Sequence, residues 1–339
     1  MGVAVTEDDI THGLSSLQFQ TNLNESELSL LHLRKRSFEL LLHAASQSTY
    51  IVGMLNTITH HIVTGDILRK GSLSKHRINI GFVGGGRLSR HIISTLVHHG
   101  VCVPHDISVS TFQPEKLDDL AKTGVHVCCN NRLVVEQSDL VFVCVPSNQL
   151  VVLKRDVDLA PRHFLISYVS TLSKHQVAEE LQHLNLLKTD YMYNKDAAYM
   201  HNEPYQSVGM TLEDELVVEK LFPGMECGFV HTSPDWIRDM ILVFYRYILR
   251  IAPDGALNRL NAVLFGNNHS FYLQEKDFRV AGGSNRIASE PDQLNDIVGV
   301  GGKVSNLNAK ISRKETLDIL YTSFQSFFKP KSVDVSKYQ

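Results

Sequence analysis

The sequence has few of the residues and runs that mark several classes of protein. Its five cysteines are odd in number, include no Cys-x-x-Cys pair, and stand mostly in apolar runs such as VFVCV. This usage favours buried free thiols in a reducing compartment over a disulfide framework. The 17 histidines include no His-Glu-x-x-His motif and no cysteine partners at zinc-site spacing, so we expect no metal site.

An excess of one charge and a long hydrophobic run are also missing. Lysine and arginine number 33 against 36 aspartates and glutamates, and the net charge of -3 gives no electrostatic reason to expect nucleic acid or an anionic membrane. No apolar run approaches the roughly 18 to 20 residues that a membrane span needs. The opening MGVAVTEDDITHG lacks the basic and apolar parts of a signal peptide. We therefore expect a cytoplasmic protein with a small-molecule ligand, and neither nucleic acid nor membrane as a partner.

The composition and the hydrophobic pattern indicate the domain organisation. The chain has 339 residues, 43% of them hydrophobic, enough for two domains or one domain with additions. Residues 1–76 are predicted to form a helical extension and linker. Over residues 77–191 short apolar strands alternate with polar helical segments, which predicts an α/β fold, a Rossmann-like doubly wound parallel sheet. Residues 192–330 are predicted to form a mostly helical C-terminal domain, and residues 331–339 a tail.

A glycine-rich turn follows the first strand of this pattern. The stretch INIGFVGGGRLS places a Gly-x-Gly at Gly84 and Gly86, a small residue at Ser89, and the start of a helix at Arg87. In such a turn the second glycine lets the backbone approach a pyrophosphate, and the third small residue lets helix and strand touch. The helix N-terminus offers free N–H groups to the phosphates. We predict a dinucleotide site, with a ligand-free turn as the alternative, at Gly84, Gly85, Gly86, Arg87 and Leu88.

Arg87 stands in the first turn of that helix. A positive charge there opposes the helix dipole and costs about 0.3 to 1 kcal/mol. A bound diphosphate would reverse the sign of this effect. We expect Arg87 to contact a phosphate, with a solvated surface arginine as the alternative.

The end of the second strand indicates which dinucleotide to expect. An NAD site usually has Asp or Glu about 20 residues after the glycines, but no acid stands between Asp106 and Glu115. Ser110 and Thr111 instead offer two hydroxyls to a 2′-phosphate, and Lys116 adds positive charge. These residues favour NADP over NAD, and no arginine stands in the loop to decide between them.

Two further strands end in residues that we expect near the ligand. Asn131 follows the third strand, and Val145 and Pro146 follow the fourth. Carboxyl ends of parallel strands converge on the crevice where ligands bind. We expect Val145 and Pro146 to lie against the nicotinamide ribose; a proline that merely ends a strand is the alternative.

Over residues 78–184 these features resemble the NADP-binding half of the pyrroline-5-carboxylate reductase family. GFVGGGRLS is similar to the glycine loop of that family, and SDLVFVCVP to its fourth strand. Ser110 and Thr111 resemble its serine pair for the 2′-phosphate, and Asn131 its asparagine on the adenosine side. The resemblance implies a Rossmann-like fold, NADP(H) as the cofactor, and reduction of an imine or carbonyl of a small molecule. It also implies a homodimer through the C-terminal helices, which the residues themselves leave open.

The second domain departs from that family. It has no counterpart of the family's Gly-Ser-Gly-Pro-Ala-Tyr helix start, and Val300 and Val304 stand where the family has Pro and Thr. Losing a hydroxyl donor would leave a substrate carboxylate short of a hydrogen bond. The expected function is therefore an NADP-dependent oxidoreductase acting on a CH–NH or CH–OH group. The alternative is an NADP-binding protein without catalysis, a sensor or scaffold.

The sequence identifies no catalytic residue. Asp190, Tyr191, Tyr193 and Lys195 form a polar cluster after the last strand, where a crevice between domains is expected. Tyr193 or Lys195 would serve as the proton donor for a reduction, and a plain interdomain loop is the alternative. The basic residues 34–36 are interpreted as a solvated helix face.

Overall fold

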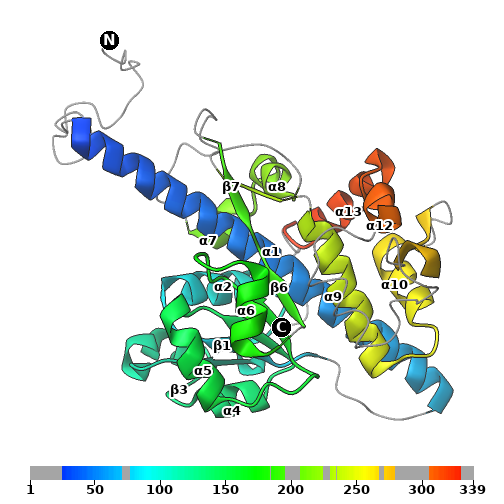
Figure 1. Ribbon diagram of the computed structural model, residues 1–339, viewed down its shortest axis with the longest axis horizontal. Helices are drawn as coiled ribbons and strands as arrows, with labels where there is room; N and C mark the ends of the chain where they lie inside the picture. The colour runs from blue at the N-terminus through cyan, green and yellow to red at the C-terminus, as the bar shows by residue number, and fades with distance from the viewer. Residues whose placement is uncertain are drawn as a thin grey trace, which may run out of the picture.

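The computed structural model of the protein describes residues 25–70, 77–183, 185–194, 207–223, 230–233, 235–266, 271–278 and 305–329. Within these residues six strands pair into one parallel sheet in the order β3-β2-β1-β4-β5-β6 (Figure 1). Because the order reverses between β1 and β4, as in Rossmann folds, the predicted α/β class is confirmed. The strands are β1 Ile80–Val83, β2 Ile107–Ser110, β3 His126–Cys128, β4 Leu140–Val143, β5 Phe164–Ser167 and β6 Leu186–Lys188.

Alternating side chains divide the core between the two faces of the sheet. Ile80 and Phe82 of β1 pack in the cluster that includes α1 (Glu25–Lys70) and α2 (Arg87–His98). Val83 and, from β4, Val141 pack in a second cluster with α5 (Leu150–Asp156) and α6 (Lys174–Leu181). The remaining short segments of this part are α3 Asp118–Lys122, α4 Asn131–Glu136 and the 3₁₀ helices η1 Pro104–Asp106, η2 Pro114–Leu117 and η3 Ser147–Gln149.

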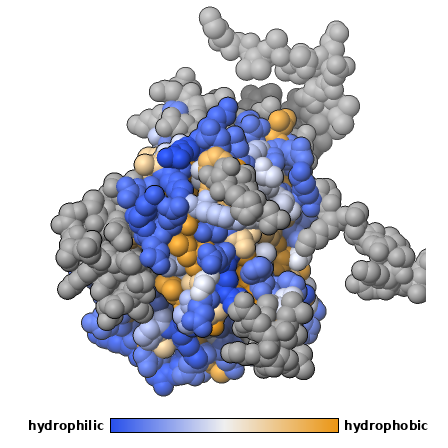
Figure 2. Space-filling view, turned by 90° about the vertical axis from the view of Figure 1, so that its right-hand side faces the viewer, coloured by the Kyte–Doolittle hydropathy of each residue, from blue (hydrophilic) through white to orange (hydrophobic). Residues whose placement is uncertain are grey.

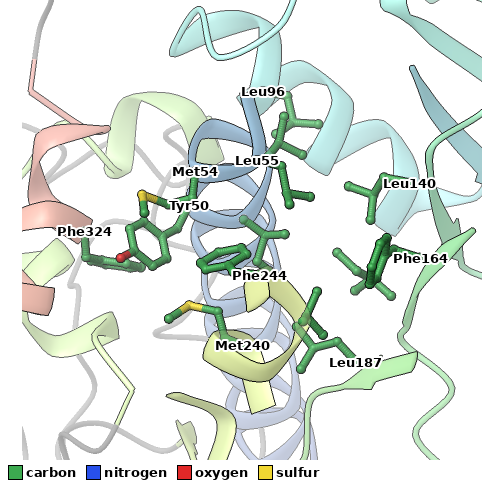
Figure 3. Packing of buried hydrophobic residues seen from close by; sticks show 14 of the residues in the cluster. Tyr50, Met54, Leu55, Leu96, Leu140, Phe164, Leu187, Met240, Phe244 and Phe324 are labelled. Carbon is green, nitrogen blue, oxygen red and sulfur yellow. The ribbon is translucent and has the colours of Figure 1, made fainter. Parts of the chain in front are cut away.

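The N-terminal helix α1 runs through the centre of the molecule. Every residue from 41 to 55 is buried, so the helix is enclosed on all sides over about four turns. Figure 3 shows Tyr50 and Leu55 of this helix between the strands of the sheet and the helices α9 (Asp235–Ile251) and α13 (Lys314–Ser326). A Cβ on Gly53 would overlap the ring of Phe327, so glycine permits this close approach. One hydrophobic core therefore extends from the sheet through α1 into the C-terminal helices.

The same helix buries a row of polar side chains. Glu39, His43 and Gln47 are four residues apart, share one face of α1, and are at most 1% exposed. They meet the strand β8 (Val230–Thr232). The Val230 N–H donates to Glu39 Oε2 (3.0 Å), and His43 Nε2 donates to the Val230 carbonyl (2.8 Å). Gln47 Nε2 donates to Thr232 Oγ1. Burial of these groups is tolerated because each one has a hydrogen-bond partner.

The C-terminal part is mostly helical, as predicted. Its strand β8 pairs antiparallel with β7 (Tyr191–Tyr193), which follows the parallel sheet directly. This pair lies against the polar face of α1 and ties the end of the sheet to the helices that follow. The other segments here are α7 Val208–Thr211, α8 Glu215–Leu221, α10 Ala256–Phe265, η5 Glu275–Phe278 and α12 Ser305–Ile311.

Several sequence predictions concern segments outside the described residues. These are the linker, the C-terminal tail, and the segment 291–304 with Val300 and Val304. The boundaries at residues 76 and 191 stay predictions, because α1 shares one core with the parts on both sides of it. None of the described helices is long and apolar enough to cross a membrane.

Candidate functional site

The glycine turn lies at the switch point of the sheet, after β1 and beside β4. Gly84 has a φ of +100°, a region that favours glycine. A Cβ there would stand 2.6 Å from the carbonyl oxygen of Cys144, just after β4. The Gly84 N–H donates to the Ser110 carbonyl (3.0 Å). The fold itself therefore requires glycine at position 84.

Gly85 and Gly86 differ in their surroundings. A Cβ on Gly85 would lie 2.6 Å from Leu117 Cδ1 and 2.9 Å from Thr111 Cβ, so neighbouring side chains close this position. A Cβ on Gly86 would meet no atom of the described residues within 4 Å. Packing among those residues thus gives no reason for the third glycine. A ligand that approaches the backbone at this point would supply one.

Helix α2 directs an uncapped N-terminus into that open space. Gly86 precedes the helix without a side-chain cap, and the first turn contains no acidic residue. The free N–H groups and positive dipole end of this 12-residue helix suit a phosphate. Ser89 is buried and donates its hydroxyl to the Gly84 carbonyl, so a small residue holds helix and turn together, as predicted. Arg87 is exposed, and among the described residues its side chain has no hydrogen-bond or ion-pair partner.

Ser110 and Thr111 end β2 beside the turn, but their side chains differ in position. Ser110 is 1% exposed, and its hydroxyl donates to the Phe82 carbonyl (3.4 Å) within the sheet. The predicted contact of Ser110 with a 2′-phosphate does not fit this position, because the last residue of the buried strand keeps its side chain in the core. Thr111 is half-buried beside Gly85, and the exposed Lys116 follows in η2.

Phe112 follows Thr111 and is 83% exposed. An exposed phenyl ring at the carboxyl end of β2 stands where the adenosine half of a dinucleotide lies in this fold. No sequence motif marks this residue. The signal that could have found it is an aromatic side chain in a loop where burial is not expected.

The residues after β3 and β4 lie at the same edge of the sheet. Val145 is beside the turn, since its Cγ1 would be 3.1 Å from a Cβ on Gly84, and Pro146 begins the loop to η3. Asn131 begins α4 and is half-buried, and its Nδ2 donates to Asp156 Oδ2 (3.3 Å). Val145 thus lies at the glycine turn, whereas the Asn131 amide is hydrogen-bonded to the end of α5. The predicted ligand contacts of these residues stay predictions.

A pocket of about 450 Å³ adjoins the glycine turn. Its volume lies in the range of about 300 to 1,000 Å³ that is usual for small-molecule sites. Leu41 and Ala44 of α1 form an apolar wall. The other side consists of the start of α2 and the residues that follow β5 and β6, including Arg87, Leu88, Tyr168, Lys188, Asp190 and Tyr193.

Two tyrosines of the pocket are held by α1. The Tyr168 hydroxyl donates to the Ala44 carbonyl (3.0 Å) and lies 2.6 Å from Ser48 Oγ. The Tyr191 hydroxyl donates to Gln47 Oε1 (3.5 Å). Burial raises the pKa of both phenols, so both stay protonated near neutral pH. Their hydroxyls therefore fix the shape of the pocket by binding α1.

The pocket also contains a buried cation. The Lys188 side chain is 3% exposed, and its Nζ donates to Asp190 Oδ1, whose side chain is 63% exposed. Sequence reasoning placed Asp190, Tyr191 and Tyr193 in a crevice, and all three line this pocket. It missed Lys188, because a lysine at the end of a strand usually points to solvent. Lys195 lies outside the described residues.

The interpretation of residues 34–36 as a solvated face is wrong for Arg36. The Arg36 guanidinium carbon lies 3.4 Å from the centre of the Tyr193 ring, at the edge of the pocket. This is a cation–π contact, which places the Arg36 side chain of α1 over β7. The side chains of residues 34 and 35 are outside the described part.

Among the described residues no group of three or more His, Cys, Asp or Glu is placed to hold a metal ion. Cys102, Cys128, Cys129 and Cys144 are free thiols, and burial raises the pKa of Cys102 and of Cys144 to about 12. Both buried thiols therefore stay protonated and inert.

The sheet and its turn define a protein of the Rossmann class, with an open helix N-terminus at the switch point where such proteins bind nucleotides. Comparison with known proteins agrees. Residues 79–171 match the family model described as NADP oxidoreductase coenzyme F420-dependent. The match begins just before β1, includes the glycine turn, and extends past β5.

Over more of its length the chain is similar to NADP-dependent oxidoreductase domain-containing protein 1 of Mus musculus. The two are 22% identical over 245 residues, which cover 68% of this chain and 66% of the mouse protein. The chain thus spans about two thirds of the length of that relative. Three segments of the sequence predict this likeness, and the comparison confirms it. They are RSFELLLHAASQST, DYMYNKD and WIRDMILVFYRYIL.

Other similar proteins are reductases. A pyrroline-5-carboxylate reductase of Methanosarcina acetivorans is 31% identical over 72 residues, 21% of this chain and 27% of that protein. The structure of a pyrroline-5-carboxylate reductase from Coxiella burnetii covers 75% of this chain and 99% of its own, with 19% identity and a TM-score of 0.32. The reductive aminase from Aspergillus terreus in complex with NADPH and ethyl levulinate covers 35% and 43%, with 13% identity and a TM-score of 0.30. These TM-scores are too low to support an argument. The names of the family model and the mouse relative both contain NADP, in agreement with the predicted cofactor.

Proposed function

We propose that the protein binds NADP(H) at the glycine turn and reduces an imine or carbonyl carbon of a small molecule in the adjoining pocket. The observation that carries the proposal is the open space at Gly86. Neighbouring atoms leave no room for a Cβ on Gly84 or Gly85. A Cβ on Gly86 would meet no described atom within 4 Å and would stand in the open space before the uncapped N-terminus of α2. The residues present therefore fit a dinucleotide pyrophosphate.

The remaining parts of the cofactor follow from the direction of the sheet. The pyrophosphate would lie against the glycine turn and the start of α2, at Gly84, Gly85, Gly86, Arg87 and Leu88. Thr111 would receive the 2′-phosphate, with Phe112 and Asn131 on the adenosine side. Val145 and Pro146 would lie against the nicotinamide ribose, which brings the nicotinamide toward the pocket that begins at Arg87 and Leu88.

The bound nicotinamide would supply a hydride, and the protein would align donor and acceptor carbons and exclude water. The pocket suits this task because α1 closes one side of it with apolar residues and fixes Tyr168 and Tyr191 by hydrogen bonds. The names of the similar proteins, a pyrroline-5-carboxylate reductase among them, support a CH–NH or CH–OH type of substrate.

Thermal unfolding with NADPH and with NADH tests the cofactor. At 100 times its Kd a ligand adds about 2.7 kcal/mol, which should raise the midpoint by roughly 4 °C. No shift with either nucleotide would refute the proposal, and a shift with NADH alone would overturn the choice of NADP. Oxidation of NADPH with a panel of cyclic imines and 2-oxo acids then tests the reaction. Binding without turnover would favour the alternative, an NADP-binding sensor or scaffold.

We also propose a cytoplasmic homodimer that associates through the C-terminal helices. Figure 2 shows the side of the molecule where α10, α12 and α13 lie, with patches of hydrophobic residues among hydrophilic ones. The proposal rests on the resemblance to the pyrroline-5-carboxylate reductase family, which implies a dimer through these helices. Sedimentation velocity measures the mass directly, and a monomer at micromolar concentration would contradict the dimer.

A further inference from the structure

Lys188 is one of three largely buried lysines that pair with an aspartate among the described residues, and the pairs differ in what surrounds them. Lys174 donates to Asp239 Oδ2 (2.7 Å), and both side chains are largely buried, at 18% and 13% exposure. Asp239 also binds Arg238, so that pair is part of a closed network. Lys188 is more deeply buried, yet its partner Asp190 is 63% exposed. Lys310 and Asp277 are also largely buried, at 16% and 5% exposure, so of the three pairs only Lys188 with Asp190 joins this pocket to solvent.

The phenols and the guanidinium that line the pocket are less suited to give up a proton. Tyr168 and Tyr191 donate their hydroxyl hydrogens to α1, at Ala44 and Gln47. Arg87 carries a guanidinium, a group that does not act as a proton donor to a substrate. The Tyr193 ring is stacked under the Arg36 guanidinium. Lys188 remains, with an ammonium group that has three donors, and Asp190 is its only side-chain partner among the described residues.

Resting on the function proposed above, we infer that Lys188 is the catalytic proton donor of the reduction and that Asp190 returns the proton to it from solvent. As the hydride from the nicotinamide bonds to the acceptor carbon, the π bond of the C=O or C=N group breaks. Its electron pair stays on the oxygen or nitrogen, which takes a proton from Lys188 Nζ. The cofactor is oxidised, and the substrate is reduced to an alcohol or amine. The neutral amine of Lys188 then regains a proton from water through the exposed carboxylate of Asp190.

The charged and titratable groups around Lys188 come from every neighbouring element. Asp190 and Arg87 line the same pocket. Helix α9 packs against β6 and carries Arg246, which binds Asn185 just before the start of that strand. The phenols that line the same pocket are those of Tyr168, Tyr191 and Tyr193.

A measurement without turnover tests the position of Lys188. Acetic anhydride acetylates amines, and mass spectrometry follows the rate at each lysine with and without saturating NADPH. We expect NADPH to slow acetylation of Lys188 at least fivefold and to leave Lys174 unchanged, since only Lys188 is reached through the pocket. Equal rates at Lys188 with and without NADPH would place it away from the cofactor and overturn the inference.

The second experiment uses the panel compound that the wild-type protein reduces fastest. General acid catalysis contributes about 10² to 10⁴ in rate, so Lys188→Ala should lower kcat at least 100-fold while the Kd of NADPH changes less than twofold. Ethylammonium should restore activity in proportion to its concentration, and tetramethylammonium, which has no proton to give, should not. Asp190→Asn keeps the size of the side chain and should lower kcat about tenfold, because the neutral amide cannot relay a proton.

The outcomes separate the two proposals. If NADPH binds and the wild-type protein turns over, but Lys188→Ala keeps kcat within threefold, the proton-donor role is wrong and the proposed function stands. If NADPH binds and no panel compound is reduced, both the reduction and the donor role are withdrawn and cofactor binding stands. If Lys188→Ala fails to fold, wild-type acetylation and Asp190→Asn still decide the matter: unchanged acetylation, or unchanged kcat in Asp190→Asn, contradicts the inference.

Discussion

Replacing Gly86 by alanine should weaken NADPH binding and leave the fold intact. The added methyl group meets no described atom within 4 Å, and the backbone at Gly86 (φ -76°, ψ -174°) is extended, so alanine introduces neither a clash nor strain. The expected cost is that of losing glycine at a helix N-cap, about 0.5 to 1 kcal/mol. For a chain of this size that lowers the unfolding midpoint by about 1 °C.

The effect on binding should be larger, because the methyl group would stand between the backbone and the pyrophosphate. We expect the affinity for NADPH to fall at least tenfold. At 100 times the wild-type Kd, the stabilisation by NADPH would then drop from about 2.7 to about 1.4 kcal/mol. Isothermal titration calorimetry measures the affinity, and thermal unfolding with and without NADPH measures the stabilisation.

Gly84→Ala is the matched control, because it should destabilise the unliganded fold, whereas Gly86→Ala should weaken ligand binding. Its φ of +100° and the 2.6 Å approach to the Cys144 carbonyl should destabilise the unliganded fold by about 1 to 3 kcal/mol. If Gly86→Ala binds NADPH as tightly as the wild-type protein, no ligand approaches the backbone there, and the reasoning from the open space is refuted.

Four further predictions concern single side chains. Phe112→Ala should weaken binding of 2′,5′-ADP at least about fivefold and leave reduced nicotinamide mononucleotide unaffected, since base–aromatic stacking is worth about 1 to 3 kcal/mol. Equal loss for both fragments would contradict stacking on adenine. Thr111→Val should reduce the preference for NADPH over NADH in competition binding, whereas Ser110→Ala, at a buried hydroxyl, should not. Arg87→Ala should flatten the dependence of NADPH affinity on salt concentration, and an unchanged slope would assign Arg87 to solvent. Burial lowers the pKa of His43 to about 4, so the unfolded chain takes up a proton at a higher pH than the folded one, and stability is lost as the pH falls from about 6.5 to 4. In urea unfolding, His43→Gln should remove roughly 3 kcal/mol of that loss of stability. An unaltered pH profile would show that His43 does not cause the loss.

The sheet and the glycine turn were predictable from the sequence because local signals determine them. Apolar runs of β1, β4 and β5 are buried on both faces, which happens only in a covered parallel sheet. Ser89 was assigned its packing role from spacing alone, and the structure confirms it. The burial of Ser110 was not predictable, since a hydroxyl at the last position of a strand turns inward or outward depending on the neighbouring strand.

The role of α1 and of Lys188 depends on partners far away in the chain. Glu39, His43 and Gln47 form a polar row that a helix usually presents to water, and nothing local shows that β8 will cover it. Lys188 is buried because the segment that follows it supplies Asp190 while α1 closes the pocket. Such positions are determined by tertiary contacts, which short-range patterns do not contain.

The central place of α1 has a consequence for synthesis of the protein on the ribosome. His43 binds Val230, which is 187 residues later in the chain. At about 5 to 20 residues per second, roughly 10 to 40 s pass between the emergence of the two. During that time the helix has neither β8 nor α9 to cover its apolar and polar faces, and it depends on molecular chaperones or on the growing sheet for protection. A fragment that begins at residue 77 would lack the segment around which both halves of the protein fold.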